Sequence, residues 1–297
     1  MHFVLTNEQR MLADAAAQFA KKTSPVERFR KLRSTSERDG DGWEPSVWKQ
    51  MAELGWLGLF YPEAVGGLGL SFFDASLVIE RLGTTLVLEP YLSSVVLAGG
   101  AVLSGATAAQ QKELLEPMTE GKTSLALAWA ERDGRYDVGA VKTTATARGG
   151  VFALEGEKVF VLNGDRADTL LVSAKTGAGV SLFAVDRTAK GLSIQRIKTM
   201  DGGHAAMVKL AGVEGRLLGT DGGAAPALDA ALDLAAAGAC AEGHGIARTV
   251  LEMTNAYLKT RKQFGVAIGS FQVLQHRAVD MFVRTQLLES VWILAAL

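Results

Sequence analysis

The chain has 297 residues, of which 48% are hydrophobic and 21% are charged, and its formal net charge is −1 at pH 7. This near-neutral balance gives no electrostatic case for binding nucleic acid or an anionic membrane surface. The single cysteine, Cys240, excludes an intramolecular disulfide and a multi-cysteine metal site, so a cytoplasmic location is the simplest expectation. The length favours two or three compact domains.

Residues 1–121 have the pattern of an all-α domain. A capping box formed by Thr6 and Gln9 opens an amphipathic helix whose charges are unlike those of a secretory signal. Pro45 suits the first turn of a later helix, and Gly55 and Gly83 suit helix ends. The uncharged stretch 90–111 raises the question of a membrane span, but its serines and glycines favour a buried helix instead.

Residues 122–222 change to short β-rich runs separated by glycine, asparagine and aspartate. Their spacing predicts an antiparallel barrel or sandwich, with strands at 143–147, 151–154, 158–162, 169–173 and 180–185. His204 follows Asp201-Gly-Gly, which predicts a loop, where a solvated histidine is more common than a catalytic one. No grouping of His, Cys and carboxylates has metal-ligand spacing, so we expect no metal site.

Residues 223–297 predict a helical bundle that is incomplete. An apolar helical pattern runs to about Gln263 and is followed by a short basic, aromatic corner. Arg261 is a planar donor suited to a pyrophosphate, and Phe264 offers a flat face to an adenine. We expect Gly265 to end the first helix in a left-handed turn and Ser270 to cap the next helix. The alternative is a surface arginine at a helix end beside a core phenylalanine.

This corner resembles the signature of the flavin-dependent acyl-CoA dehydrogenases. The resemblance covers nearly the whole chain and includes a Gly-Gly turn in 60–71 and a pair of central strands in 154–172. It implies a multi-domain α+β fold with an N-terminal all-α domain, a central antiparallel β-barrel or sandwich, and a C-terminal helical bundle. It also implies that FAD is the cofactor and that Arg261, Gln263, Phe264 and Gln272 reach its adenine-diphosphate half across a subunit interface.

Three further family positions are altered in this chain. Most relatives have Thr-Glu where this chain has Ala130-Glu131, so only flavin contacts from the segment Leu127, Trp129 and Ala130 can be carried over, and one hydroxyl is lost. The family's Trp-Ile-Thr beside the flavin ring becomes 160–162, which keeps an aromatic wall at Phe160 and places Leu162 where the second hydroxyl would be. For Phe160, a core position on a strand is an equal alternative.

The substrate and base positions also differ. Arg135 and Tyr136 replace residues that help to bind CoA, and they offer its phosphates a basic group and a hydroxyl. In one branch of the family the catalytic Glu aligns with Ala235, which cannot accept a proton. In the larger branch it lies on a later helix, so we expect the base and a second glycine-rich FAD contact beyond Leu297. Glu242 is a weak candidate, for which a buried or interface carboxylate is the more common role.

The resemblance implies an FAD-dependent acyl-CoA dehydrogenase that acts on an acyl-CoA thioester, with dicarboxylyl- and cyclic acyl-CoA as candidate substrates. An electron-transfer flavoprotein is the implied electron acceptor. A cross-subunit arginine implies a homo- or hetero-oligomer, built in the family as a dimer of dimers. The alternative is a non-catalytic partner subunit of a heteromeric acyl-CoA dehydrogenase, contributing FAD contacts and structure.

Overall fold

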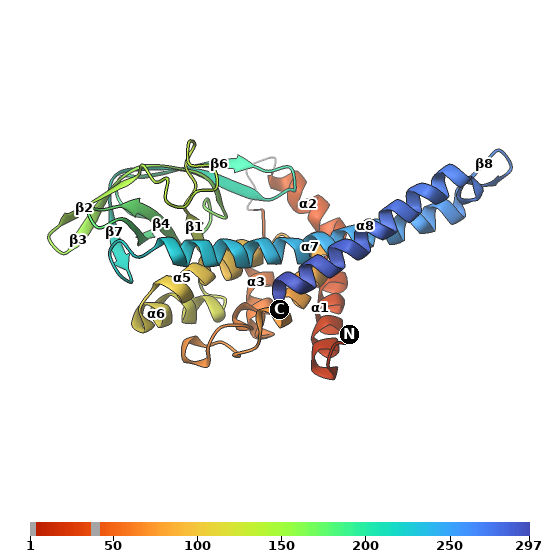
Figure 1. Ribbon diagram of the computed structural model, residues 1–297, viewed down its shortest axis with the longest axis horizontal. Coiled ribbons are helices and arrows are strands. Elements are labelled where there is room, and N and C mark those ends of the chain that lie inside the picture. The colour runs from red at the N-terminus through yellow and green to blue at the C-terminus, as the bar shows by residue number, and fades with distance from the viewer. Residues whose placement is uncertain (1–3, 37–41) are drawn as a thin grey trace. The chain divides into compact units, whose positions relative to one another are not determined.

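A computed structural model describes residues 4–36 and 42–297 of the chain (Figure 1). It contains two compact units. The helical unit consists of residues up to Phe29 together with Phe72–Val87 and Ala237–Leu297, and the β-containing unit consists of Arg30–Ser71 and Leu88–Ala236.

The N-terminal part of the chain is helical, as predicted. Capping boxes at Thr6 and Thr107 are both formed, and Pro45 occupies the first turn of its helix. Gly55 has a left-handed backbone, and α4 ends at Gly83 as expected. The elements in chain order are α1 Asn7–Thr23, α2 Val26–Ser36, α3 Pro45–Glu53, η1 Trp56–Gly58, η2 Glu63–Val65, α4 Phe72–Gly83, η3 Tyr91–Ala98, α5 Gly99–Gly105 and α6 Ala108–Thr119.

The uncharged stretch 90–111 is buried over most of its length, but it is more than one helix. It begins as the π-helix η3, continues as α5 and breaks at Ala106 before the Thr107 cap. The ring of Tyr61 fits against Gly99, where a Cβ would lie 1.8 Å from its hydroxyl oxygen. Among the helices formed by the described residues, none is long and apolar enough to cross a membrane.

The central strands form one sheet in the β-containing unit (Figure 1). Their hydrogen-bonded order is β1-β4-β2-β3-β7-β5, and a β4–β5 pairing closes a ring. The enclosed core includes Leu154, Val172, Phe183 and Val213. The strands are β1 Leu125–Ala128, β2 Thr144–Arg148, β3 Val151–Leu162, β4 Thr169–Lys175, β5 Val180–Asp186, β6 Leu192–Lys198 and β7 His204–Leu218. This is the predicted barrel-like architecture.

The sheet differs from the prediction in several details. Strands β1, β6 and β7 lie outside the five predicted runs. The runs 151–154 and 158–162 are one strand, β3, which continues through two register shifts against β7. Strand β1 lies parallel to β4 rather than antiparallel. All four of its residues are buried, so it lacks the alternation that marks a half-exposed strand in a sequence.

The C-terminal segment is a helical hairpin. Helix α7, Ala225–Thr260, and helix α8, Gln272–Ala296, are joined by β8 Lys262–Gln263, β9 Val266–Ala267 and the 3-10 turn η4 Ile268–Ser270. In this hairpin the α7 end packs closely on the connection, because a Cβ on Gly269 would lie 2.8 Å from the carbonyl oxygen of Leu258.

The predicted Gly-Gly turn is present and has a clear physical cause. Gly66 has φ +80°, and a Cβ on Gly67 would lie 2.1 Å from the carbonyl oxygen of Tyr61. That carbonyl is itself fixed, because it accepts a 2.8 Å hydrogen bond from the N–H of Gly69. The second glycine is therefore required for close approach of two backbone segments.

We expect Gly67→Ala to lower the free energy of unfolding by about 3 kcal/mol, because the Tyr61 carbonyl has no room to move away. Gly69→Ala is the matched control, since Gly69 has φ +64° but no atom within 4 Å of an added Cβ. Backbone strain alone costs the control about 1 kcal/mol. Urea unfolding measures both, and equal losses would contradict the packing explanation.

Candidate functional site

The predicted cofactor residues fall into two groups. Leu127, Trp129, Ala130, Phe160 and Leu162 belong to the β-containing unit, and Arg261, Gln263, Phe264 and Gln272 belong to the helical unit. Within each group the residues come from neighbouring segments.

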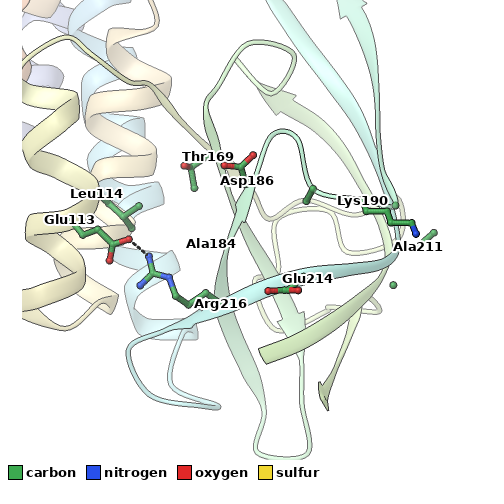
Figure 2. Close-up of a pocket in the computed structure, with 12 residues that line it drawn as sticks. Glu113, Leu114, Thr169, Ala184, Asp186, Lys190, Ala211, Glu214 and Arg216 are labelled. Carbon is green, nitrogen blue, oxygen red and sulfur yellow. Dashed lines mark hydrogen bonds and ion pairs between the residues drawn. The ribbon is translucent and has the colours of Figure 1, made fainter. Parts of the chain in front are cut away.

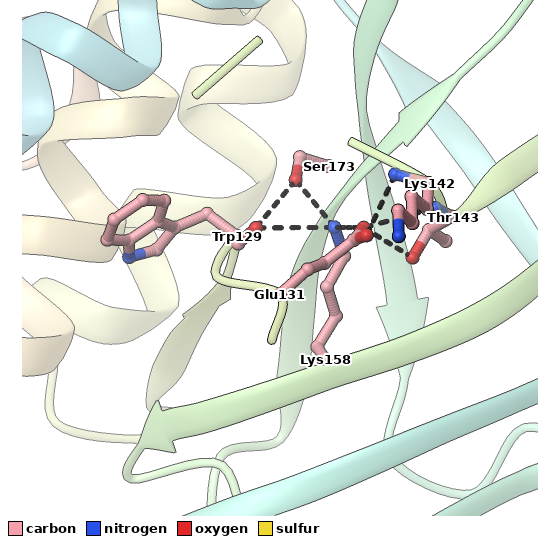
Figure 3. A network of polar contacts seen from close by, with 6 residues as sticks. All are labelled: Trp129, Glu131, Lys142, Thr143, Lys158 and Ser173. Atoms are coloured by element: carbon pink, nitrogen blue, oxygen red, sulfur yellow. Dashed lines mark hydrogen bonds and ion pairs between the residues drawn. The ribbon is translucent and has the colours of Figure 1, made fainter. Parts of the chain in front are cut away.

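A buried ion pair supports the first group (Figure 3). The Nζ atom of Lys158 on β3 donates to Glu131 Oε1 at 2.7 Å, to Ser173 Oγ at 2.9 Å and to the Trp129 carbonyl at 3.3 Å. The Lys158 side chain is fully buried, and that of Glu131 is 8% exposed. The pair therefore connects the segment after β1 to β3 and β4.

The carboxylate of Glu131 is also hydrogen-bonded on its other side. It accepts from the hydroxyl of Thr143 at 2.7 Å, from the N–H of Thr143 at 3.1 Å and from the N–H of Lys142 at 2.8 Å. Both oxygens are therefore satisfied, as a buried charge requires.

Burial and pairing act in opposite directions on these two groups. Burial lowers the pKa of Lys158 to about 8, although the hydrogen bond and charge of Glu131 act to raise it. Burial raises the pKa of Glu131, but the hydrogen bond and charge of Lys158 together with the bonds from Thr143 and Lys142 outweigh it, and the pKa lies below its usual value.

The lowered pKa of Lys158 predicts a specific pH dependence of stability. An unfolded lysine has a pKa of about 10.4, so between about pH 8 and pH 10.4 the unfolded chain binds more protons at this position than the folded chain. The free energy of unfolding therefore rises with pH in that window, by about 1 kcal/mol per pH unit. We expect the free energy of unfolding of the wild type to rise by this amount relative to that of the double variant K158M/E131Q. Unfolding titrations over this pH range measure both proteins, and parallel pH profiles would contradict the prediction.

The positions that were predicted to contact the flavin ring lie beside this ion pair. The carbonyl of Ala130 accepts a 2.9 Å hydrogen bond from the N–H of Val159, which joins the segment after β1 to β3. At the next residue the strand bulges, and Phe160 takes φ +55°. As a result Phe160 is 57% exposed and Leu162 is 36% exposed, whereas Leu127 is buried. The alternative of a core phenylalanine at position 160 is wrong.

The second group lies between two helix ends: Arg261 directly follows α7, Gln263 and Phe264 lie on a tight hairpin, and Gln272 begins α8. Helix α7 ends at Thr260, and β8 and β9 enclose a two-residue turn in which Phe264 has φ +54° and Gly265 has φ +80°. Two positive φ values in this position are typical of a type I′ turn. The left-handed Gly265 is confirmed, but its role in ending the helix is a correction, because the helix ends five residues earlier.

The aromatic ring at the tip of the hairpin is exposed to solvent. Phe264 is 92% exposed, and Arg261, Gln263 and Gln272 are exposed too. The expected cap from Ser270 is wrong: its hydroxyl donates to the Ala267 carbonyl at 2.8 Å, and the N-cap position of α8 is Phe271, whose side chain cannot cap. The sequence signal failed because Ser270 is the last residue of a 3-10 turn and α8 begins one residue later than a cap at Ser270 requires.

The two candidate CoA residues lie in the turn that follows β1. Arg135 has φ +50° and is exposed, and Tyr136 is 91% exposed. Both side chains are therefore accessible to a phosphate.

His204 is not a solvated loop residue. It begins β7, its side chain is 4% exposed, and its Nδ1 atom lies 3.1 Å from Asp165 Oδ2. The same oxygen accepts from Arg196 Nε at 2.7 Å. Burial acts to raise the pKa of Asp165. The hydrogen bond and charge of His204, together with the charge of Arg196, outweigh burial, so the pKa of Asp165 lies below its usual value. The sequence could not reveal this cluster, because its members come from three separated segments.

Glu242, the weak candidate for the base, lies on the part of α7 in the helical unit. Its backbone packs on α4, where a Cβ on Gly83 would lie 2.5 Å from the Glu242 carbonyl oxygen, and its side chain is half-buried. Two residues further along α7, His244 is buried and its Nδ1 atom lies 3.2 Å from Glu80 Oε1. The role of Glu242 as a base stays a prediction.

A separate concavity of about 850 Å³ lies on the β-containing unit (Figure 2). An ion pair of 2.8 Å between Arg216 and Glu113 lies in its wall, and Asp186, Glu214 and Lys190 add further charges. Its lining contains none of the predicted cofactor residues. The three carboxylates of this concavity would repel phosphate groups. We therefore do not propose it as the nucleotide site.

The sequence of domains matches three family models in order. The acyl-CoA dehydrogenase N-terminal domain matches residues 6–122, the middle domain matches 126–212 and the C-terminal domain matches 221–296. The chain belongs to the acyl-CoA dehydrogenase family. It is therefore an oxidoreductase of a family whose members depend on FAD.

Individual acyl-CoA dehydrogenase relatives agree with this assignment. The structure is similar to that named "Tcur3481-Tcur3483 steroid ACAD G363A variant", with 32% identity, a TM-score of 0.85, and coverage of 97% of this chain and 76% of that one. It is also similar to the glutaryl-coenzyme A dehydrogenase glutaryl-CoA complex, with 25% identity, a TM-score of 0.91, and coverage of 100% and 78%. The caffeyl-CoA reductase-Etf complex subunit CarC of Acetobacterium woodii is 29% identical over 95% of this chain and 76% of its own length.

Proposed function

We propose that this protein is an FAD-dependent enzyme that introduces a double bond between the α- and β-carbons of an acyl-CoA thioester. The observation that carries the proposal is the face beside the β3 bulge, where Phe160 and Leu162 are exposed next to the backbone of Ala130. Large apolar side chains at the edge of a barrel, with a polar backbone beside them, suit a flat ring system that has both apolar faces and polar edges.

The residues on this face fit a flavin ring. Phe160 supplies an aromatic wall and Leu162 an aliphatic one. In the part of the chain that the structure describes, the N–H of Ala130 donates to no protein acceptor, so it remains as a donor for a ligand. The fit is incomplete, because Ala130 and Leu162 lack the hydroxyls that the family resemblance implies at these positions.

The hairpin between α7 and α8 fits the other half of FAD. Arg261 supplies a charged fork for a pyrophosphate, and the exposed ring of Phe264 supplies a stacking surface for adenine. Gln263 and Gln272 add amide groups nearby. We propose that this hairpin serves a flavin bound by another subunit, which makes an oligomer, built as a dimer of dimers, the functional form.

In the proposed reaction the substrate loses a proton from its α-carbon to a base and a hydride from its β-carbon. Bound FAD would supply the hydride acceptor. The chain's own contribution is to hold the ring against Phe160 and to bind the CoA phosphates, for which Arg135 and Tyr136 are the proposed contacts. Positioning of this kind removes much of the entropic barrier. The base is not assigned.

We further propose a dicarboxylyl or cyclic acyl group as the substrate. Two segments, 131–137 and 158–164, resemble the small subunit of pimeloyl-CoA dehydrogenase, a two-subunit enzyme. Support comes from two similar structures, one named for a steroid enzyme and one solved as a complex with glutaryl-CoA, which carries a dicarboxylyl group. An electron-transfer flavoprotein is the proposed acceptor, as the name of the CarC complex suggests for that relative. The cytoplasm remains the proposed compartment.

A second candidate function is a non-catalytic partner subunit in a heteromeric acyl-CoA dehydrogenase. It is favoured by alanines at positions 130 and 235, which remove a flavin-binding hydroxyl and a candidate base. In that case Arg261 and Phe264 would complete a flavin site on another chain.

The visible absorbance spectrum of the purified protein tests both candidates. It is recorded without oxygen, before and after straight-chain, dicarboxylyl and cyclic CoA thioesters are added. A flavin band that bleaches with one thioester supports the dehydrogenase and identifies its substrate class. A colourless protein, or a flavin that no thioester reduces, contradicts independent catalysis and favours the partner subunit.

A further inference from the structure

The buried ammonium of Lys158 contacts a backbone carbonyl as well as its ion-pair partner. Its Nζ atom lies 3.3 Å from the Trp129 carbonyl oxygen, and the hydroxyl of Ser173 donates to the same oxygen at 3.4 Å (Figure 3). Glu131 and Ser173 hold the ammonium at this position. A charge enclosed in this way acts on the carbonyl with little screening by water.

The contact reaches the flavin-facing side of the chain through one peptide group. The Trp129 carbonyl and the Ala130 N–H belong to the same trans peptide, so they point in opposite directions. A cation at the oxygen draws electron density from the nitrogen and makes the N–H a stronger donor. That N–H donates to no acceptor among the residues that the structure describes.

The same segment is fixed on its other side. The Ala130 carbonyl accepts from the Val159 N–H at 2.9 Å, immediately before the bulge that exposes Phe160. The Ala130 N–H is therefore held rigidly beside the face that we assign to the flavin ring. This is also the position at which the chain has a methyl group in place of a hydroxyl.

We propose that Lys158 is a positioning residue for the flavin, which orients and strengthens the Ala130 N–H as a donor to the ring through the Trp129 carbonyl. This inference rests on the proposed function. It explains why a lysine is fully buried on β3 beside the site. A stronger donor favours the electron-rich reduced form of FAD over the oxidised form.

The test compares the affinity of the protein for reduced FAD with its affinity for oxidised FAD. This ratio is obtained from the midpoint potential of the FAD-loaded protein, measured against a reference dye. In K158M/E131Q both charges are removed with their approximate volumes kept. We expect the ratio of affinities to fall about tenfold, which corresponds to about 30 mV for a two-electron couple. K209M/E157Q is the matched control, because it removes an exposed ion pair from β7 and β3 that does not contact the Trp129 carbonyl, and we expect it to leave the ratio within about threefold of wild type.

A role in folding alone would leave the potential unchanged, so an unaltered potential in a folded K158M/E131Q protein overturns the inference. If that variant does not fold, Lys158→Gln replaces it, because an amide still donates to Glu131 and Ser173 but carries no charge. The same fall is expected, and an unaltered potential again overturns the inference. A wild type that binds FAD and is reduced by a thioester leaves the proposed function intact in either case, whereas a wild type that binds no FAD overturns both.

Discussion

Replacing Lys158 alone by methionine is expected to lower the free energy of unfolding by about 3–5 kcal/mol, because it leaves the Glu131 carboxylate buried without its cation. Glu131 keeps its bonds from Thr143 and Lys142, but hydrogen bonds from neutral donors do not replace an ammonium. Chemical unfolding of the single variant beside the wild type measures the loss.

The double variant K158M/E131Q provides the control for this prediction. It removes the pair together, and replacing a buried pair by neutral groups of similar volume is often close to neutral. We therefore expect it to recover most of the stability that the single variant loses. A double variant as unstable as Lys158→Met would show that the loss comes from packing of the methionine side chain and not from the unpaired carboxylate.

Replacing Arg261 by alanine is expected to weaken FAD binding about 100-fold, since charge-assisted bonds to a pyrophosphate contribute up to about 3 kcal/mol. Phe264→Ala is expected to weaken it about tenfold through loss of stacking. Neither change should alter the unfolding midpoint of the chain, because both side chains are exposed. Titration of FAD into the apoprotein measures the affinities.

Lys262→Ala is the matched control for the hairpin. It removes a positive charge next to Arg261, from an exposed position on the short strand β8. We expect it to change FAD affinity by less than about threefold. If the three variants bind FAD equally well, the hairpin does not contact the cofactor. If the chain only completes a site on a partner subunit, the Arg261→Ala effect appears in the mixed assembly and not in the isolated chain.

Local sequence patterns predicted the parts of the fold that depend on interactions between residues close together in the chain. The capping box at Thr6 and the Gly66-Gly67 turn each involve residues within a few positions of one another, and both are present. Strand β1 was not predicted because its parallel partner β4 lies more than forty residues away, and its four buried residues have no alternating pattern.

The candidate site was predictable only in part for the same reason. The corner residues were located by their resemblance to a family motif, and the structure exposes Arg261 and Phe264 as that role requires. The Glu131–Lys158 pair was missed, although a lysine within the apolar run 158–162 was a usable signal for a buried partner. The burial of His204 could not be predicted, since Asp165 and Arg196 approach it only in the folded sheet.

The conformation of Phe264 serves the proposed contact with flavin but does not stabilise the fold. A non-glycine residue with φ +54° is strained, and the ring of Phe264 is 92% exposed, with an edge-to-face contact to Phe271 at 6.0 Å between ring centroids to offset that strain only in part. Asparagine or glycine at this position would suit a type I′ turn better. A library of variants sorted only for thermal resistance would therefore lose Phe264, whereas a library sorted for retained flavin would keep it.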